Sequence, residues 1–244
     1  MLRKLLAGLG LSALAAGSPN GNPPYAPYPE GAPANDIYNL LFCDNPSAFG
    51  PKAGQTPAAW QVALSSEPPN IPALQSLAED AAQEGRIRYL AYARLRALGI
   101  TVPAKRLLGV IVEFPLAGGL DALAAYSEGG VRYINHTGKL AFLEPLPSIQ
   151  PYVERLFAAS QPVVARIGPW REARRPPPKE GQVRLTFLVS EGLYFGEGPM
   201  STMQRDAMAS PVIQKATELL QALVALTSKG DHGGGDAPTA PAQN

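Results

Sequence analysis

The sequence predicts a single α+β domain in which an antiparallel sheet of about six strands packs against three main helices. Of the 244 residues, 45% are hydrophobic, which is enough for one sizeable core. Short apolar segments separated by Gly-rich turns predict an antiparallel meander. Segments with apolar residues at helical spacing precede, interrupt and follow these strands. The resulting order is α-ββββ-α-ββ-α, and it extends over residues 35–228.

The first part of the domain is predicted to be mainly helical. Residues 37–43 form an apolar run that fits either a strand or a short helix, and the scattered prolines of residues 51–72 indicate an irregular loop. Residues 73–98 place their apolar side chains on one face of a long helix. Gly85 lies on that face, so we expect a neighbouring strand to approach it closely, and Gly99 is expected to end the helix.

Four strands are predicted to follow at hairpin spacing. The first of them is almost wholly apolar, which is typical of a central strand that is covered on both faces. Gly-containing segments between the later strands are expected to form the turns of hairpins. The four predicted strands are residues 107–114, 120–126, 131–135 and 139–144.

The second half of the domain is predicted to contain two helices and a further pair of strands. A helix over residues 149–167 is expected to be capped by Ser148 and to kink or split at Pro162. Residues 182–189 alternate between apolar and polar side chains, as a half-buried strand does, and a turn leads into the segment that completes the pair. A last helix over residues 210–226 is expected to start with Ser210 as its cap and Pro211 as its first residue.

The two ends of the chain have compositions unlike that of the domain. Residues 1–17 have a short basic start, an uncharged stretch rich in Leu and Ala and a small-residue cleavage pattern, which together indicate a signal peptide. We therefore favour export to the periplasm or the medium over the alternative, a short helix on a cytoplasmic protein. The stretch is too short for a transmembrane span. Residues 18–34 are expected to be a disordered Pro-rich linker and residues 229–244 a disordered tail.

The sequence contains no pattern that indicates a catalytic site, a metal site or a cofactor site. A net charge of +1 argues against nucleic acid as a partner, and one cysteine and two histidines are too few for a Cys/His zinc site. The serine-hydrolase patterns G-x-S-x-G and S-x-x-K do not occur. The alternative hypothesis of a small hydrolase would have to use Cys43 with His136, or the turn carboxylates Glu128 and Glu191.

The main functional hypothesis is therefore a non-enzymatic binding or assembly protein, whose partner is another protein or a second copy of the chain. We expect the interaction surface at a sheet edge or at residues 193–200, a predicted loop rich in aromatic residues and glycine. A basic, Pro-rich segment over residues 169–181 is a second candidate surface for an acidic partner, although a solvated loop would have the same composition. The candidate contact residues are Tyr194, Phe195, Met200, Trp170, Arg171, Arg174 and Arg175.

Overall fold

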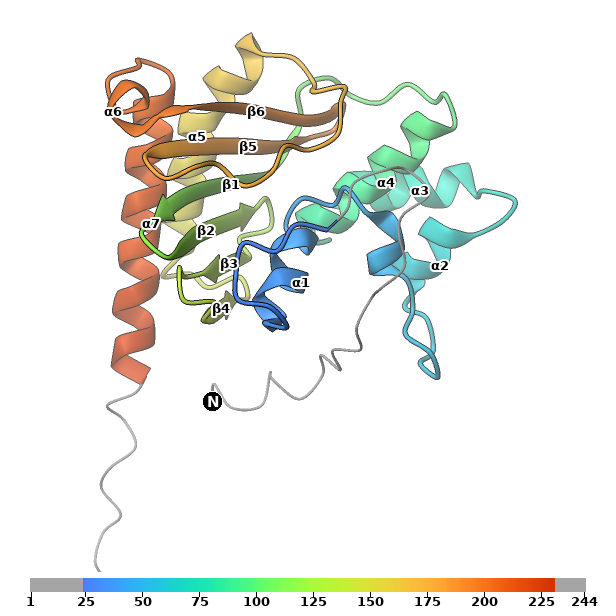
Figure 1. Ribbon diagram of the computed structural model, residues 1–244. Helices are drawn as coiled ribbons and strands as arrows, with labels where there is room; N and C mark the ends of the chain where they lie inside the picture. The colour runs from blue at the N-terminus through green and yellow to red at the C-terminus, as the bar shows by residue number, and fades with distance from the viewer. Residues whose placement is uncertain (1–23, 231–244) are drawn as a thin grey trace, which may run out of the picture.

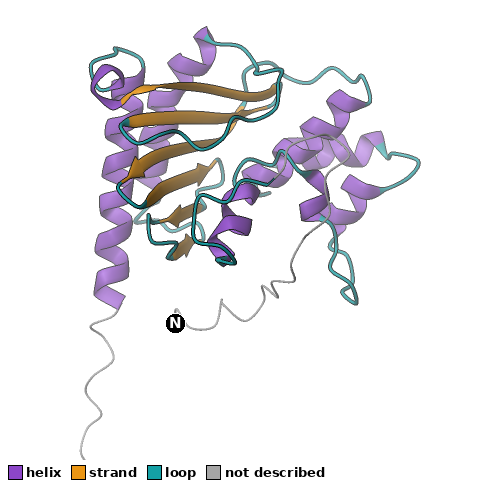
Figure 2. Cartoon of the chain, in the orientation of Figure 1, coloured by secondary structure: helices purple, strands orange, loops and turns teal. Residues whose placement is uncertain are grey.

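The computed structural model describes residues 24–230, and in this part of the chain six strands form one antiparallel sheet with helices on both faces (Figures 1 and 2). The strand order is β4-β3-β2-β1-β5-β6, so β4 and β6 are the two edges. The predicted α+β class is confirmed. The predicted signal peptide and the tail beyond residue 230 lie outside the described residues. No helix within the described range is both long enough and apolar enough to cross a membrane.

The strands agree closely with the predicted ones, except at the sixth. Residues 193–200, predicted as a loop, instead form most of the edge strand β6, because a tight turn after Val189 pairs them along the whole of β5. β1 lies between β2 and β5 at the centre of the sheet. The strands are β1 (Leu107–Leu116), β2 (Gly119–Tyr126), β3 (Val131–Ile134), β4 (Leu140–Leu143), β5 (Gln182–Val189) and β6 (Gly192–Pro199).

The first face of the sheet is covered by helices from the N-terminal half of the chain. Helices α1 (Pro33–Leu40) and α4 (Gly85–Ala97) pack on this face, α3 (Ile71–Glu79) packs against α4, and α2 (Ala59–Ser65) packs against α3 and α4. The apolar run at residues 37–43 therefore belongs mainly to a helix. The hydrophobic core on this face of the sheet includes Tyr38, Phe42, Leu74, Tyr92 and Ile111.

Two predictions for this region are wrong. The loop predicted over residues 51–72 contains α2 and the start of α3, and the long helix predicted over residues 73–98 is two helices. The helix breaks because Asp80 leaves the helical conformation and its carboxylate accepts a hydrogen bond from the backbone of Ala82. The predicted close approach at Gly85 is confirmed, since a Cβ there would lie 2.2 Å from the carbonyl oxygen of Leu108 on β1.

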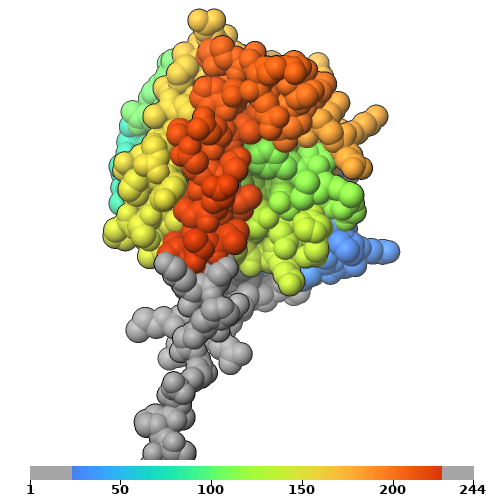
Figure 3. All heavy atoms as spheres, turned by 90° about the vertical axis from the view of Figure 1, so that its left-hand side faces the viewer, coloured from blue at the N-terminus to red at the C-terminus, as the bar shows by residue number. Residues whose placement is uncertain are grey.

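The second face is covered by α5 (Gln150–Arg166) and α7 (Ala209–Gly230), which lie side by side over the sheet (Figure 3). Val110, Leu156, Phe187 and Leu219 are among the buried residues of this second core. The short helix α6 (Met200–Met203) joins β6 to α7.

The predicted helix ends on this face need correction. Helix α5 begins after Ile149, with no side-chain cap from Ser148, and it continues without a break through Pro162. At the start of α7 the carboxylate of Asp206, rather than Ser210, accepts hydrogen bonds from the backbone of Met208 and Ala209.

The chain before α1 packs on the domain instead of forming a free linker. Within the predicted linker of residues 18–34, the structure describes residue 24 onwards. Tyr28 is buried and donates its hydroxyl hydrogen to the carbonyl oxygen of Leu120 at 2.9 Å. Tyr25 donates in the same way to the carbonyl oxygen of Arg174 at 2.7 Å. The domain therefore begins before residue 35.

Candidate functional site

Three of the predicted contact residues meet at the outer edge of the sheet. Residues 168–181, which we call the strap, connect α5 to β5. The ring of Trp170 in the strap packs edge-to-face on the ring of Phe195 in β6, with centroids 4.9 Å apart. The guanidinium carbon of Arg175 lies 5.0 Å from the Trp170 centroid and 5.5 Å from the Phe195 centroid. Trp170 and Phe195 are half-buried and Arg175 is exposed, so this aromatic and cationic group is open to solvent.

The backbone of β6 beside this group is unpaired on its outer side. The N–H of Trp170 donates to the carbonyl oxygen of Leu193 at 2.7 Å, which shows that the polar groups of Leu193 point away from β5. Backbone groups of alternate residues point to the same side of an antiparallel strand, so those of Phe195 and Glu197 also point outward. Neither residue has a backbone hydrogen bond beyond the sheet within residues 24–230. β6 therefore presents an open edge over these residues.

Two other predicted contact residues, Tyr194 and Met200, do not lie on this surface. Tyr194, predicted as a contact residue, is instead fully buried on the opposite face of the sheet. Its hydroxyl donates to Glu191 Oε2 at 3.0 Å, and burial raises the pKa of Tyr194 to about 12. Met200 begins α6 and packs against the second core.

A row of charged side chains crosses the sheet beneath the strap. Glu113 on β1, Arg184 on β5 and Glu197 on β6 are aligned by the strand register. Arg184 Nε donates to Glu197 Oε2 at 2.7 Å, and Arg184 Nη1 lies 3.7 Å from Glu113 Oε2. Arg184 also donates to the strap carbonyl oxygens of Arg175 and Pro176. This row therefore fixes the position of the strap and, through it, the stacked group at the edge.

The inner end of this row is a fully buried carboxyl group. Glu113 accepts a hydrogen bond from the hydroxyl of Tyr38 at 2.7 Å, whereas Glu113 Oε2 is buried without a hydrogen-bond partner in the described chain. Burial raises the pKa of Glu113, and the nearby positive charge of Arg184 opposes that rise.

Arg174, predicted as a surface contact, is instead a buried anchor of the strap. Its Nε donates to Asp44 Oδ2 at 2.6 Å and its Nη2 donates to Asn39 Oδ1 at 2.9 Å. Its guanidinium carbon lies 4.1 Å from the centroid of the Phe42 ring. Its neighbour Arg171 is exposed. The basic segment is thus divided between anchoring residues and exposed ones, a division that composition alone does not reveal.

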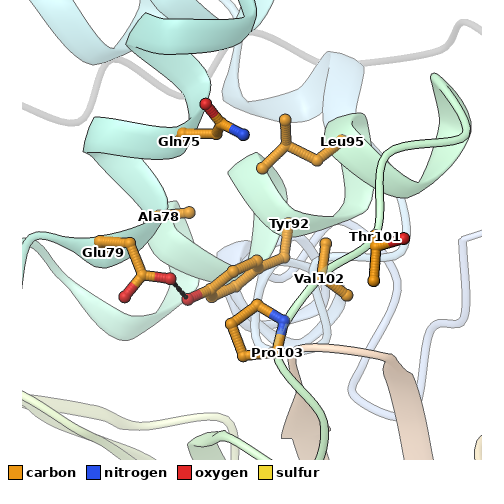
Figure 4. Close-up of a pocket in the computed structure, with 8 residues that line it drawn as sticks. All are labelled: Gln75, Ala78, Glu79, Tyr92, Leu95, Thr101, Val102 and Pro103. Atoms are coloured by element: carbon orange, nitrogen blue, oxygen red, sulfur yellow. Dashed lines mark hydrogen bonds between the residues drawn. The ribbon is translucent and has the colours of Figure 1, made fainter.

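A small pocket lies between α3, α4 and the segment that leads into β1 (Figure 4). Its volume is about 210 Å³, below the ~300–1,000 Å³ of most small-molecule sites. The hydroxyl of Tyr92 donates to Glu79 Oε1 at 2.7 Å and accepts a hydrogen bond from Arg106. Arg106 also donates to Glu79 Oε2, and the hydrogen bonds that Glu79 accepts from Tyr92 and Arg106 lower its pKa. The polar groups satisfy one another, so this pocket is a weaker candidate than the β6 edge.

Sequence reasoning missed this pocket because the helix break was not predicted. In one continuous helix Glu79 and Tyr92 fall on opposite faces, and only the turn between α3 and α4 brings them into contact.

The residues of the hydrolase hypothesis have separate partners. Cys43 is buried, its thiol contacts the carbonyl oxygen of Leu40, and burial raises its pKa. His136 lies in the β3–β4 turn, where its backbone N–H donates to Asp121 Oδ1 at 2.6 Å.

The two turn carboxylates have structural roles. Glu128 accepts a hydrogen bond from the backbone of Gly85 at 2.7 Å, and Glu191 accepts one from the backbone of Lys105 at 2.8 Å. In the part of the chain that the structure describes, no three His, Cys, Asp or Glu side chains gather in a way that could hold a metal ion.

Comparison of the chain with protein-family models and with curated proteins gives no significant match.

Proposed function

We propose that this protein is a non-enzymatic binding module that receives an extended polypeptide segment as an additional strand at the outer edge of β6. The observation that supports this proposal is the outward orientation of the Phe195 and Glu197 backbone groups, which have no partner across the edge within residues 24–230. Strand addition supplies such groups with main-chain hydrogen bonds, and pockets for alternate side chains provide the specificity.

The side chains around the edge suit this mode of binding. On the strap side, Trp170, Arg175 and Phe195 offer aromatic faces and an exposed positive charge to an incoming residue. On the other side, a Cβ at Gly196 would have no atom within 4 Å, so an incoming side chain has room there. The bound segment is short, because Trp170 already occupies the carbonyl oxygen of Leu193 at one end.

The proposal is tested with peptides selected from a random decapeptide display library on the wild-type protein. Backbone amide exchange is then measured by NMR with and without a selected peptide. We expect the amides of Phe195 and Glu197 to become protected in the complex. The amides of Tyr194 and Gly196 point towards β5, so they are internal controls and should not change. Protection elsewhere only would contradict the proposal, as would selection of no binder by a protein in which the Phe195 and Glu197 amides exchange freely.

A pair of variants at one position separates the backbone from the side chain. Phe195→Pro removes the outward N–H without removing a bond to β5, a substitution that edge strands tolerate. Phe195→Ala removes the ring but keeps the N–H. We expect Phe195→Pro to weaken peptide binding at least ~10-fold beyond Phe195→Ala, since one net hydrogen bond is worth about 1 kcal/mol and the proline ring also obstructs the added strand. Equal affinities of the two variants would argue against strand addition.

A further inference from the structure

We infer that the segment that β6 receives is β6 of a second copy of this chain, paired antiparallel about a two-fold axis at Gly196. This inference rests on the proposed function, because it uses the same open edge. An edge strand binds its own copy only if the groups on one side of its midpoint complement those on the other. The backbone of β6 and the charges beside it both meet this condition.

The backbone groups match when Gly196 faces Gly196 of the second copy. In this register Phe195 faces Glu197 of the second copy, and symmetry repeats the pair on the other side of the axis. Directly opposite residues whose polar groups face each other exchange two hydrogen bonds in an antiparallel pair. The outward N–H and C=O groups of Phe195 and Glu197 are thereby all satisfied.

The same register explains why the pairing would end where it does. Beyond these pairs, Leu193 would face Pro199 of the second copy, and proline has no N–H to donate. The carbonyl oxygen of Leu193 needs no such donor, because Trp170 already donates to it at 2.7 Å. The strap therefore closes the edge at the position where the second strand cannot continue.

The charges near the axis are complementary as well. Arg175 is exposed over the Phe195 ring and has no ion pair within residues 24–230. Within each copy Arg184 already holds Glu197 Oε2. Because Phe195 faces Glu197 of the second copy, the other carboxylate oxygen, Glu197 Oε1, is brought beside the exposed guanidinium of Arg175. Two such contacts form, one on each side of the axis. A register with Phe195 opposite Phe195 would instead place Glu197 beside Leu193.

A cysteine at the axis tests this arrangement directly. Opposite residues of a non-hydrogen-bonded antiparallel pair have Cα atoms about 4.5 Å apart, which lies within the range that a disulfide spans. A Cβ at Gly196 meets nothing within 4 Å, so Gly196→Cys can be accommodated. Gly198→Cys is the matched control, because in this register residue 198 faces Tyr194 of the second copy. The native cysteine, Cys43, is buried, and the wild-type protein is the control for any cross-link that forms through it.

Under a mild oxidant and non-reducing electrophoresis, we expect Gly196→Cys to form a covalent dimer and Gly198→Cys to remain a monomer. Adding Phe195→Pro to Gly196→Cys should abolish the dimer, and light scattering should show a wild-type dimer that Phe195→Pro dissociates. A Gly196→Cys protein that stays monomeric, or a Gly198→Cys protein that cross-links as readily, would overturn the inference. If selected peptides protect Phe195 and Glu197 while the wild type stays monomeric, the proposed function holds and self-pairing is wrong.

Discussion

The hydroxyl of Tyr38 on α1 donates a hydrogen bond of 2.7 Å to Glu113 on β1, and both side chains are completely buried. Glu113 faces Arg184 across the strands, and Arg184 holds both Glu197 and the strap. A network of hydrogen bonds and ion pairs therefore runs from α1 across the strands of the sheet to the β6 edge. Buried polar groups in such a network are costly when one partner is removed.

Removing the Tyr38 hydroxyl should destabilise the fold. Tyr38→Phe leaves Oε1 of Glu113 without its donor in the interior, and an orphaned buried polar group costs about 1–3 kcal/mol. The free energy of unfolding in urea measures this loss. Tyr152→Phe is the control, because the Tyr152 hydroxyl has no hydrogen-bond partner in the described part of the chain and its removal should cost under ~0.5 kcal/mol. Equal effects of the two substitutions would show that the Tyr38–Glu113 bond contributes nothing.

The raised pKa of Glu113 should appear as a pH dependence of stability. Burial raises this pKa above the unfolded value of about 4.3, so the folded state binds the proton more tightly. The resulting stability is fully present below the unfolded pKa and is lost as pH rises through the folded pKa. Relative to Glu113→Gln, the wild type should therefore lose free energy of unfolding as the pH rises above the unfolded pKa of about 4.3, by no more than ~1.4 kcal/mol per pH unit.

Urea titrations of both proteins across this range measure the difference. All other carboxyl groups are shared by the two proteins, so their contributions largely cancel. A difference that does not change with pH would contradict a raised pKa at Glu113.

The strands were predictable because their signals are local. The apolar run of β1 reflects burial on both faces, and the alternation of Val183, Leu185, Phe187 and Val189 identifies β5 as a strand. The expectation that β5 is only half-buried is wrong, because its polar residues Arg184 and Thr186 are buried as well. A strand was expected to complete the pair with β5, but the extent of β6 was underestimated because its glycines resemble turn residues, whereas its pairing is imposed by β5. The break between α3 and α4 depends on one Asp80 side chain and one backbone N–H, which leave no trace in hydrophobic periodicity.

The candidate site was predictable only in part. Aromatic and basic residues near residues 170 and 195 were identified by composition, and the structure places Trp170, Arg175 and Phe195 together. The role of Arg174 could not be predicted, because its partners Asn39 and Asp44 lie at the other end of the chain. Long-range ion pairs of this kind follow from the fold and are invisible in a local segment.

A methyl group at Gly85 should disturb the contact between α4 and the sheet. The Cβ of Gly85→Ala would lie 2.2 Å from the carbonyl oxygen of Leu108, a backbone atom that cannot move independently. Overpacking of this kind costs about 1–3 kcal/mol, measured as a lower free energy of unfolding in urea. Gly168→Ala is the control, since a Cβ there meets nothing within 4 Å and its φ lies outside the left-handed region. A Gly85→Ala protein as stable as Gly168→Ala would show that α4 and β1 can separate without cost.

Loss of Arg174 should release the strap. Arg174→Ala removes the guanidinium that joins the strap to Asp44 and Asn39, and breaking a buried ion pair costs about 3–5 kcal/mol. Trypsin should then cleave after Arg171 faster than in the wild type, as mass spectrometry of the fragments would show. Arg174→Lys should give little protection, because an ammonium group cannot reproduce the two-point contact of the guanidinium. Glu180→Ala, an exposed substitution in the same strap and away from the cleaved bond, should leave the cleavage rate unchanged. An Arg174→Ala protein that resists trypsin as well as Glu180→Ala does would show that Arg184 alone holds the strap in place.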